Sequence, residues 1–321
     1  MRWSRGPTMR LCDYATNTMN LANLASILIN IIFPIVLIAA VGFTLAKKLG
    51  VEARPLSRTM LYFFTPALVF SQTYHAKLSS EYVSIAVFSI VMTIVMVIVS
   101  WLLAKVLRYD RLTMSAFMLG VLFVNAGNYG LPLVLFAFGD EGLARAAFYF
   151  TMSAILVQTL GIFVAARGKA NARAALMNTL KLPLVYAVTI GLIFNLARIE
   201  MPAPLTKAID LTSGAAVPTM LVILGLELAR AKIEDDRAVI GLATLTKLIV
   251  VPLLAFPLAA LMGLDGLTRA VCIVEASMPT AVMATIVAVE FDARPKLVTG
   301  IVFVSTLGSI VTLTILLGIL K

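Results

Sequence analysis

Charged residues, histidine and cysteine are scarce in this chain. Of its 321 residues, 13% are charged, one is histidine and two are cysteine, whereas 61% are hydrophobic and the mean hydropathy is +1.00. Soluble domains are about a quarter charged and about half apolar. A soluble core cannot absorb this much apolar surface, so we predict a multi-pass membrane protein. The two cysteines, Cys12 and Cys272, do not indicate a disulfide framework.

Motifs of intramembrane enzymes and of ATP-driven pumps are also absent. The sequence has no Gly-x-Gly-Asp, Gly-x-Ser-Gly or His-Glu-x-x-His, and its one histidine, His75, falls in a connection between apolar runs. It has no Walker A loop to hold ATP phosphates. We therefore predict neither an enzyme nor a primary pump, and we expect no cofactor. The formal charge of +10 is typical of basic loops that face the lipid bilayer, and we expect no nucleic acid partner.

Long apolar runs are what the sequence does contain, and they reach the roughly 20 residues that a helix needs to cross a bilayer. Helices satisfy their own backbone groups in lipid, so we predict an all-α membrane protein. The first run is too long for the core of a signal peptide, and residues 1–23 before it form an N-terminal tail. The ten expected spans are 24–46, 56–74, 82–104, 112–138, 143–166, 175–197, 205–228, 238–261, 267–290 and 297–320.

Lysine and arginine gather on alternate connections between these spans. The odd-numbered connections hold fifteen, namely Lys47, Lys48, Arg54, Arg58, Lys105, Arg108, Arg111, Arg167, Lys169, Arg173, Arg230, Lys232, Arg237, Arg294 and Lys296. The even-numbered ones hold five: Lys77, Arg145, Arg198, Lys207 and Arg269. The positive-inside rule then predicts cytoplasmic odd connections and two non-cytoplasmic termini in a cell inner membrane. The arginines of the N-terminal tail oppose this orientation, and a start at Met9 or Met19 would remove most of the conflict.

Similar segments recur about 150 residues apart. "FPIVLIAAVG" in the first span is matched by "LPLVYAVTIG" in the sixth, "PLSR" (55–58) by "PLTK" (204–207), "TPALV" by "VPTMLV", and "RLTMSAF" (111–117) by "GLTRAVC" (266–272). One match would be chance, but four in the same order predict a duplication. Each copy has five spans, an odd number, so the second copy must be inverted. The sequence predicts two inverted five-helix repeats, 24–167 and 168–321.

Two spans are interrupted at matching places. "NAGNYGLP" (125–132) breaks the fourth span and "ASMPT" (276–280) breaks the ninth. Pro132 and Pro279 cannot donate a backbone hydrogen bond but fit the first turn of a new helix. Each span therefore reads as two half-helices joined by a linker, which is tolerated at membrane depth only inside protein or beside a cavity. A proline kink is the alternative, but the second break favours a binding site where two crossover helices meet.

"NAGNYGLPLVLFAFG", "MPTAV" and the five-plus-five arrangement resemble the auxin efflux carrier family of membrane transporters. The brief 167–174 connection resembles that of the short bacterial members. The resemblance implies a secondary transporter of a small organic anion, a carboxylate such as malonate, malate or an auxin-like acid. It also implies a scaffold of spans 1, 2, 6 and 7, usually a homodimer, and a core of spans 3–5 and 8–10 with elevator-like movement. The second break lacks the asparagine that many plant members carry there, which leaves the substrate open.

The predicted site is suited to an anion. Half-helix N-termini near Leu131–Pro132 and Pro279 are expected to meet at the midplane and to bind anionic groups through free N–H groups. Glycines would let the backbone approach the ligand closely. Tyr129 has an equal alternative as a packed aromatic with a satisfied hydroxyl. The predicted substrate-binding residues are Asn125, Gly127, Asn128, Tyr129, Gly130, Pro132, Ser277, Pro279 and Thr280.

Two ionisable residues lie inside predicted spans, Lys247 in the eighth and Glu275 one turn before Pro279. Such residues are functional-site hypotheses by default. Glu275 is expected to pair with Lys247, with a role as proton carrier as the alternative, and Lys247 would also suit the charge of an anionic substrate. The coupling ion, H+ or Na+, stays open. The rival function is a multi-pass sensor or scaffold without transport, which gives no reason to break two helices.

Overall fold

The computed structural model describes residues 21–77, 79–165, 180–231 and 236–321. Most of the N-terminal tail and the predicted repeat boundary at 167/168 lie outside these residues. So do four of the basic residues counted for the orientation: Arg167, Lys169, Arg173 and Lys232.

The described chain is helical, and its only β-contact is an isolated antiparallel bridge between Val124 and Thr280. In chain order the elements are α1 (Leu21–Ile27), η1 (Leu28–Ile32), α2 (Phe33–Leu49), α3 (Ala53–Thr59), η2 (Met60–Phe64), α4 (Thr65–His75), α5 (Glu81–Val106), α6 (Arg111–Leu122), η3 (Ala126–Gly130), α7 (Leu131–Ala165), α9 (Pro183–Leu196), α10 (Ala203–Gly214), α11 (Ala216–Leu228), α12 (Arg237–Leu245), η4 (Thr246–Val250), α13 (Val251–Leu261), α14 (Gly266–Ala276), α15 (Met283–Glu290) and α16 (Pro295–Leu320). The all-helical prediction is confirmed.

Five helical segments of the described chain are long and apolar enough to cross a membrane. They are Leu21–Leu49, Glu81–Val106, Ala203–Leu228, Arg237–Leu261 and Pro295–Leu320, and each coincides with a predicted span. Where they are described, the other predicted spans fall on shorter or interrupted helices, and residues 166 and 175–179 of two of them lie outside the described chain. His75, expected in a loop, is instead the last residue of α4, where Nδ1 lies 3.0 Å from the Ser71 carbonyl oxygen.

Proline positions explain where the helices widen. Four π-helical turns, η1 to η4, each end two residues before a proline: Pro34, Pro66, Pro132 and Pro252. Proline has no N–H, and its ring crowds the carbonyl four residues earlier. A turn with bonds spanning five residues relieves this crowding without ending the helix. These four prolines thus mark widened turns rather than helix ends, whereas Pro257 lies inside α13 without one.

A glycine separates the predicted fourth and fifth spans. Gly139 interrupts α7 with φ 69° and ψ −163°, a backbone conformation that residues with a Cβ rarely adopt. The sequence placed the end of one span at residue 138 and the start of the next at 143. The break at Gly139 agrees with that division.

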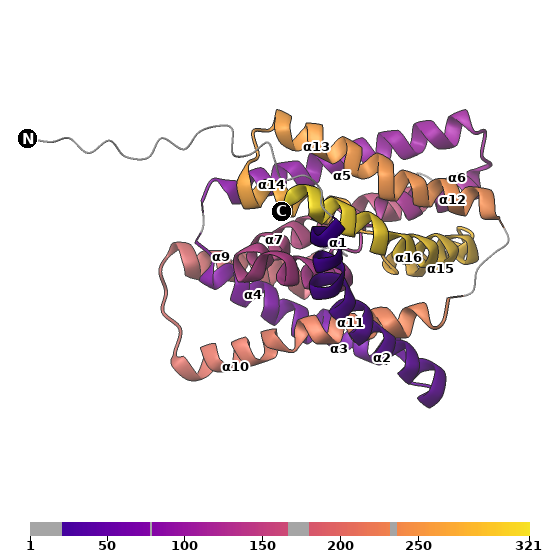
Figure 1. The fold of residues 1–321 in the computed structure, drawn as a ribbon. Helices are drawn as coiled ribbons and strands as arrows, with labels where there is room; N and C mark the ends of the chain where they lie inside the picture. Colours follow the sequence, from indigo (N-terminus) through magenta and orange to yellow (C-terminus); the bar gives the residue numbers. More distant parts are fainter. Residues whose placement is uncertain (1–20, 78, 166–179, 232–235) are drawn as a thin grey trace, which may run out of the picture.

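The helices form two packed groups (Figure 1). In one, α2 packs on α11, and α4 packs on α9 and α10. The other contains α5, α6, α7 and α12 to α16, with α5 against α7, α6 against α16, and α14 against α7. The groups touch where α4 meets α7 and where η3 meets α11. The interrupted segments after α6 and α14 lie inside the second group.

Candidate functional site: the crossing of two broken helices

The two interrupted segments meet and bond through their backbones. The N–H of Asn125 donates to the carbonyl of Pro279 (2.9 Å), and the N–H of Ala281 donates to the carbonyl of Phe123 (3.0 Å). The bridge between Val124 and Thr280 lies between these bonds. Segments about 155 residues apart therefore cross inside the protein, which is where irregular backbone is tolerated at membrane depth.

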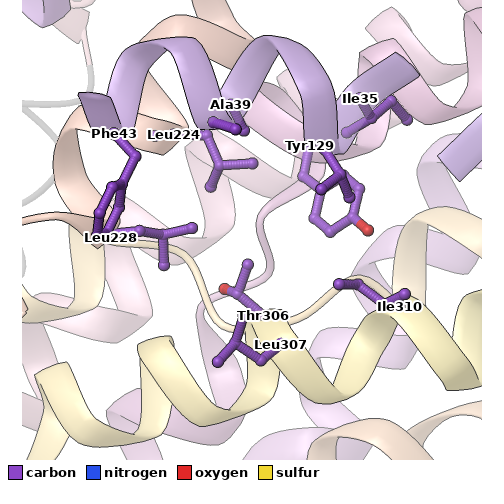
Figure 2. A pocket seen from close by; sticks show the side chains of 12 residues that line it. Ile35, Ala39, Phe43, Tyr129, Leu224, Leu228, Thr306, Leu307 and Ile310 are labelled. Carbon is purple, nitrogen blue, oxygen red and sulfur yellow. The ribbon is translucent and has the colours of Figure 1, made fainter. Parts of the chain in front are cut away.

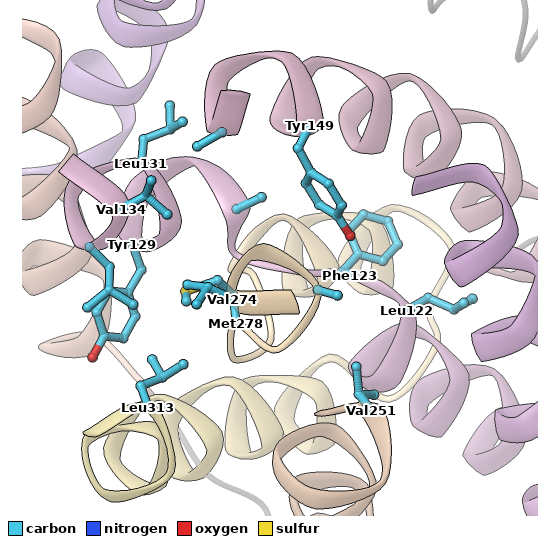
Figure 3. Close-up of a cluster of buried hydrophobic side chains, with 14 of the residues drawn as sticks. Leu122, Phe123, Tyr129, Leu131, Val134, Tyr149, Val251, Val274, Met278 and Leu313 are labelled. Carbon is cyan, nitrogen blue, oxygen red and sulfur yellow. The ribbon is translucent and has the colours of Figure 1, made fainter. Parts of the chain in front are cut away.

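Apolar side chains enclose this crossing. Figure 3 shows Phe123, Val274 and Met278 within the buried cluster, with Tyr149 and Leu131 on neighbouring segments. Phe123 is 1% exposed, and Val274 and Met278 are 0% exposed. Buried backbone groups need hydrogen-bond partners, and the bonds between the two segments supply several of them.

The second half-helices begin at other residues than the sequence predicted. The first was expected near Leu131–Pro132, but the π-helical turn Ala126–Gly130 precedes it and runs directly into α7. The N–H of Gly130 donates to the Asn125 carbonyl at 3.0 Å. The prediction was wrong by about one turn, because a widened turn lets helix begin before a proline. The half-helix therefore starts at Ala126, with Asn125 as its N-cap, directly beside the crossing.

The other second half-helix starts later than expected. It was placed at Pro279, but α15 begins at Met283 and its first turn is closed by Ala284 and Thr285, whose N–H groups donate to Ala281 and Val282. Pro279 lies in the extended linker, where its carbonyl accepts the bond from Asn125. The sequence placed this start wrongly because proline fits an extended linker as well as a first turn.

The predicted side-chain ligands divide into two kinds. The hydroxyls of Ser277 and Thr280 donate to the carbonyls of Ile273 (2.6 Å) and Gly120 (2.6 Å). Within the described chain the side chains of Asn125 and Asn128 make no hydrogen bond. Asn125 is 5% exposed and Asn128 is half-buried. The first break therefore carries amide groups that a ligand can use, whereas the hydroxyls of the second break already serve the fold.

Tyr129 behaves as a packed aromatic in this structure. It is 2% exposed, and its hydroxyl interacts with Ser309 of α16. Figure 2 shows its ring beside Ile35 of α2 and above Ile310 of α16, at a cavity of about 200 Å³ lined almost entirely by apolar side chains. Tyr129, in the first break, therefore packs against α2 of one helix group and α16 of the other.

Lys247 and Glu275 are buried but do not form the expected ion pair. They are 2% and 0% exposed. The Lys247 ammonium donates to the carbonyl of Val121 at 3.1 Å, one turn before the crossing. Within the described residues neither carboxylate oxygen of Glu275 has a hydrogen-bond partner. The expected pair is absent because Lys247 is held by the C-terminal end of α6, where the helix dipole favours a cation.

Glu275 lies directly against the glycine at the end of the widened turn. A Cβ on Gly130 would meet both carboxylate oxygens of Glu275, at 2.8 Å for Oε1 and closer for Oε2. No larger residue fits at position 130 without moving this carboxylate. Gly127, in contrast, faces the ring edge of Phe150, whose Cε2 would be 2.8 Å from an added Cβ. The sequence predicted that both glycines let the backbone approach a ligand; the neighbours that the structure gives them are protein side chains, and Glu275 beside Gly130 was not predicted.

A larger cavity, of about 410 Å³, separates the two helix groups near the crossing. Glu227 and Arg230 line it from the end of α11, and Thr285 and Lys296 from the α15–α16 side. Val282, two residues after Thr280, also lines it. The Oε2 atom of Glu227 is buried without a hydrogen-bond partner among the described residues. No group of three or more metal-ligating side chains occurs in the described ranges.

Comparisons with known proteins agree with this architecture, which defines a helical membrane protein whose broken helices cross inside it. The family described as "Membrane transport protein" matches residues 27–176 and 170–317. The chain belongs to this family of transporters, and its resemblance to auxin efflux carriers of the short bacterial type is thereby confirmed.

Several relatives carry transporter names. An uncharacterized transporter of Methanothermobacter thermautotrophicus is 30% identical over 293 residues, which cover 88% of this chain and 95% of that protein. An uncharacterized transporter of Methanocaldococcus jannaschii is 25% identical over 298 residues, 89% of this chain and 96% of that protein. A Rhizobium meliloti protein whose name proposes malonate transport is 25% identical over 205 residues, 61% of this chain and 64% of its own length. The family and these relatives indicate a transporter rather than an enzyme.

Proposed function

We propose that this protein is a secondary transporter that binds a small organic anion, a carboxylate such as malonate, malate or an auxin-like acid, at the crossing of its broken helices. One observation carries the proposal: the unbonded amides of Asn125 and Asn128 stand at the start of a half-helix beside the crossing. A helix start offers N–H groups and positive partial charge to an anion. Gly127, Gly130, Pro132 and Pro279 shape the backbone there, while Ser277, Thr280 and Tyr129 hold it in place.

The ten-span architecture with two inverted repeats belongs to this proposal. Gly42 lies against the Val222 backbone, and Gly191 lies against Thr73, where a Cβ added to the glycine would be 3.0 Å from the Thr73 Cβ. Gly42 and Gly191 are 149 residues apart, as are Thr73 and Val222. The same close contact thus recurs between spans 1 and 7 and between spans 6 and 2. This pattern supports a duplication with repeats 24–167 and 168–321.

The two helix groups support an elevator-like mechanism. The group of α2, α4, α9, α10 and α11 corresponds to the scaffold of spans 1, 2, 6 and 7, and the crossing lies in the other group. Both cavities lie between the groups. A boundary with this much unfilled space suits movement of one group past the other, with the site carried along. We also propose that the scaffold helices form a homodimer in the lipid bilayer.

Lys247 and Glu275 are the proposed charge and coupling residues. The ammonium group of Lys247, on η4, lies at the C-terminal end of α6, the helix that leads to the crossing. Its positive charge there favours an anion nearby. Glu275 touches Gly130 of the site, so a proton or a sodium ion on its carboxylate would alter the surroundings of the ligand. Coupling of the anion to H+ or Na+ would then act through this contact.

Uptake into proteoliposomes tests the transport proposal. Purified protein is reconstituted, and uptake of labelled malonate, malate, acetate and indole-3-acetate is measured at two pH values, with and without sodium. We expect saturable uptake of at least one acid, and its loss in the Asn125→Ala variant. If no acid is taken up or bound, a sensor or scaffold role without transport becomes the better account.

The proposed orientation is tested separately. With both termini outside, a cysteine introduced as Gly168→Cys in a Cys12→Ala, Cys272→Ala background should resist an impermeant thiol reagent in intact cells. A cysteine introduced as Lys207→Cys should react. Labelling of the first and protection of the second would reverse the orientation in the inner membrane.

A further inference from the structure

An arginine-centred cluster lies at one end of the helix group that contains the crossing. Arg145 of α7 donates to Oε2 of Glu81 at the start of α5, through Nη2 (3.0 Å) and Nε (3.2 Å). Its Nε also donates to the hydroxyl of Thr268 on α14 at 3.0 Å. The Thr268 hydroxyl in turn donates to Glu81 at 2.5 Å. The three side chains form a closed ring of hydrogen bonds between three helices.

A second cluster repeats this chemistry. Arg294, directly before α16, donates through Nη2 to Oδ2 of Asp236 at the start of α12 (3.1 Å) and through Nη1 to the hydroxyl of Thr113 on α6 (2.7 Å). The Thr113 hydroxyl donates to Oδ2 of Asp110, the residue that caps α6 (2.5 Å). This bond, with the N–H groups of Thr113 and Leu112, holds the pKa of the Asp110 carboxyl below its usual value.

The two clusters are related by the internal repeat. Asp236 lies 155 residues after Glu81, and Thr268 lies 155 residues after Thr113. In each cluster the arginine and the acid that it binds come from one repeat, and the threonine comes from the other. Each cluster therefore joins the two halves of the core to each other.

Both threonines occupy the first turn of a half-helix that ends at the crossing. Thr113 is on α6, which ends at Leu122, and Thr268 is on α14, which ends at Ala276. At 1.5 Å per residue, each is roughly 12–14 Å from its break. The threonines are 4% and 3% exposed, so their hydroxyls have fixed partners rather than water. If either threonine is displaced, the short helix that carries it moves as a unit and displaces the break at its other end.

We propose that Arg145 and Arg294 are positioning residues of the crossover site. Each fixes the far end of one broken helix and so sets the register in which the two breaks meet. The inference rests on the proposed function for its effect on transport, but the register itself is a property of the fold. The arginine side chains are 18% and 24% exposed, and partly exposed ion pairs contribute little to stability. Their removal should therefore change the site more than the stability.

The first measurement is the transport KM of Arg145→Gln and Arg294→Gln in proteoliposomes, with the melting temperature of each variant. We expect KM to rise roughly tenfold, as a displaced binding group predicts, with the melting temperature lowered by less than about 4 °C. Arg145→Lys should not restore KM, because an ammonium cannot reproduce the planar fork that reaches Glu81 and Thr268 together. Arg145→Gln combined with Thr268→Val should cost less than the sum of the two single changes, because both remove the bond between Arg145 and Thr268.

Matched controls come from the same helices. Arg269 follows Thr268 on α14, and Arg111 opens α6, and neither belongs to a cluster. Arg269→Gln and Arg111→Gln remove the same charge near the same helix ends. They should keep the parent KM, and a KM change equal to that of the cluster variants would assign the effect to charge alone and overturn the proposal.

A second measurement does not depend on any substrate. Cysteines introduced as Val124→Cys and Thr280→Cys, in a background without the native cysteines, replace the bridge pair of the crossing. Opposed residues of such a bridge have Cβ atoms about 5 Å apart, so a membrane-permeant oxidant should link them readily. The link should form several times more slowly with Arg145→Gln or Arg294→Gln.

The two measurements separate the two proposals. If the disulfide forms more slowly in the arginine variants while the parent protein takes up no acid, the positioning role is upheld and the transport proposal is rejected. Normal linking and a normal KM in both arginine variants would overturn the positioning role, whatever their melting temperatures. A large fall in melting temperature with parent KM and parent linking would likewise show that the clusters only stabilise the fold.

Discussion

The two breaks occupy matching places in the chain but differ in what their side chains do. The first, 123–130, carries two asparagines without side-chain partners in the described structure and continues into a widened turn. The second, 277–282, is closed by Ser277 and Thr280, whose hydroxyls are bonded to backbone carbonyls. Ser305 of α16 additionally accepts from the Thr280 N–H at 3.2 Å. The first break therefore has side-chain amides available for the ligand that we propose, whereas the hydroxyls of the second break are bonded to the protein's own backbone.

Among the variants that test the difference between the two breaks, Gly130→Val should have the largest effect on ligand affinity. The new side chain would collide with the Glu275 carboxylate, restrict the turn, and fill space beside the helix start. We expect carboxylate affinity to fall by more than about 100-fold, at or beyond the upper limit for the loss of one hydrogen bond to a charged group. Binding to purified protein in detergent is the measurement. Gly127→Ala, which faces the movable ring of Phe150, is the control and should lose much less. If both variants bind like the parent, the first break is not the site.

Replacement of Asn125 or Asn128 by alanine should have the next largest effect on ligand affinity. Asn125→Ala or Asn128→Ala removes an amide that can bond a charged ligand, a loss of roughly 1.5–3 kcal/mol, or about one to two orders of magnitude in affinity. Ser277→Ala is the matched change in the second break. It should lower the melting temperature slightly and leave affinity close to that of the parent, because its hydroxyl is bonded to Ile273. A larger affinity loss for Ser277→Ala than for either asparagine would reverse the roles of the breaks.

Lys247 and Glu275 both lie beside the first break, against Val121 and Gly130 respectively, and their replacement should have a smaller, separable effect on transport. Lys247→Met removes a charge and leaves the Val121 carbonyl without its donor, so transport should fall by about tenfold, as one hydrogen bond to a charged group predicts. Glu275→Gln should weaken the dependence of uptake on pH or on sodium. Because the two side chains are not paired, the double variant should be additive within about 0.5 kcal/mol. Strong coupling between them would mean that they meet in another conformation of the transport cycle.

Pro132→Ala should have the smallest effect. Alanine restores an N–H that can donate within the helix, so the widened turn is free to narrow and stability should stay the same or rise. Affinity should fall only a few-fold as Asn125 and Asn128 shift, an effect below about 1 kcal/mol. Pro66→Ala, which follows the widened turn η2 in the group of α2, α4, α9, α10 and α11, should leave affinity unchanged. Unfolding of Pro132→Ala with normal binding in the asparagine variants would make this stretch a structural kink.

Much of this arrangement was accessible from the sequence, element by element. The long spans coincide with five described helices because apolar length is a local property. The two breaks were located because glycine and proline disrupt helices wherever they occur. The half-helix starts were misplaced by about one turn, because a proline that follows a widened turn and one in a linker look alike in sequence. The partners of Lys247 and Glu275 were missed for another reason, since sequence spacing does not say which carbonyl or glycine comes within reach.

Reading the chain alone is enough to identify a helical membrane protein that resembles a transporter family, with two interrupted helices at matching positions. Hydropathy, helix-breaking residues and internal similarity are properties of the amino-acid sequence, so they can be recognised without knowledge of any tertiary contact. The packing of the helices, which the sequence does not show, bonds the two breaks to each other, brings Lys247 to Val121 and places Glu275 against Gly130. It alone brought Arg145 to Thr268 and Arg294 to Thr113. These contacts join residues more than 100 positions apart, and their geometry is set by how whole helices pack.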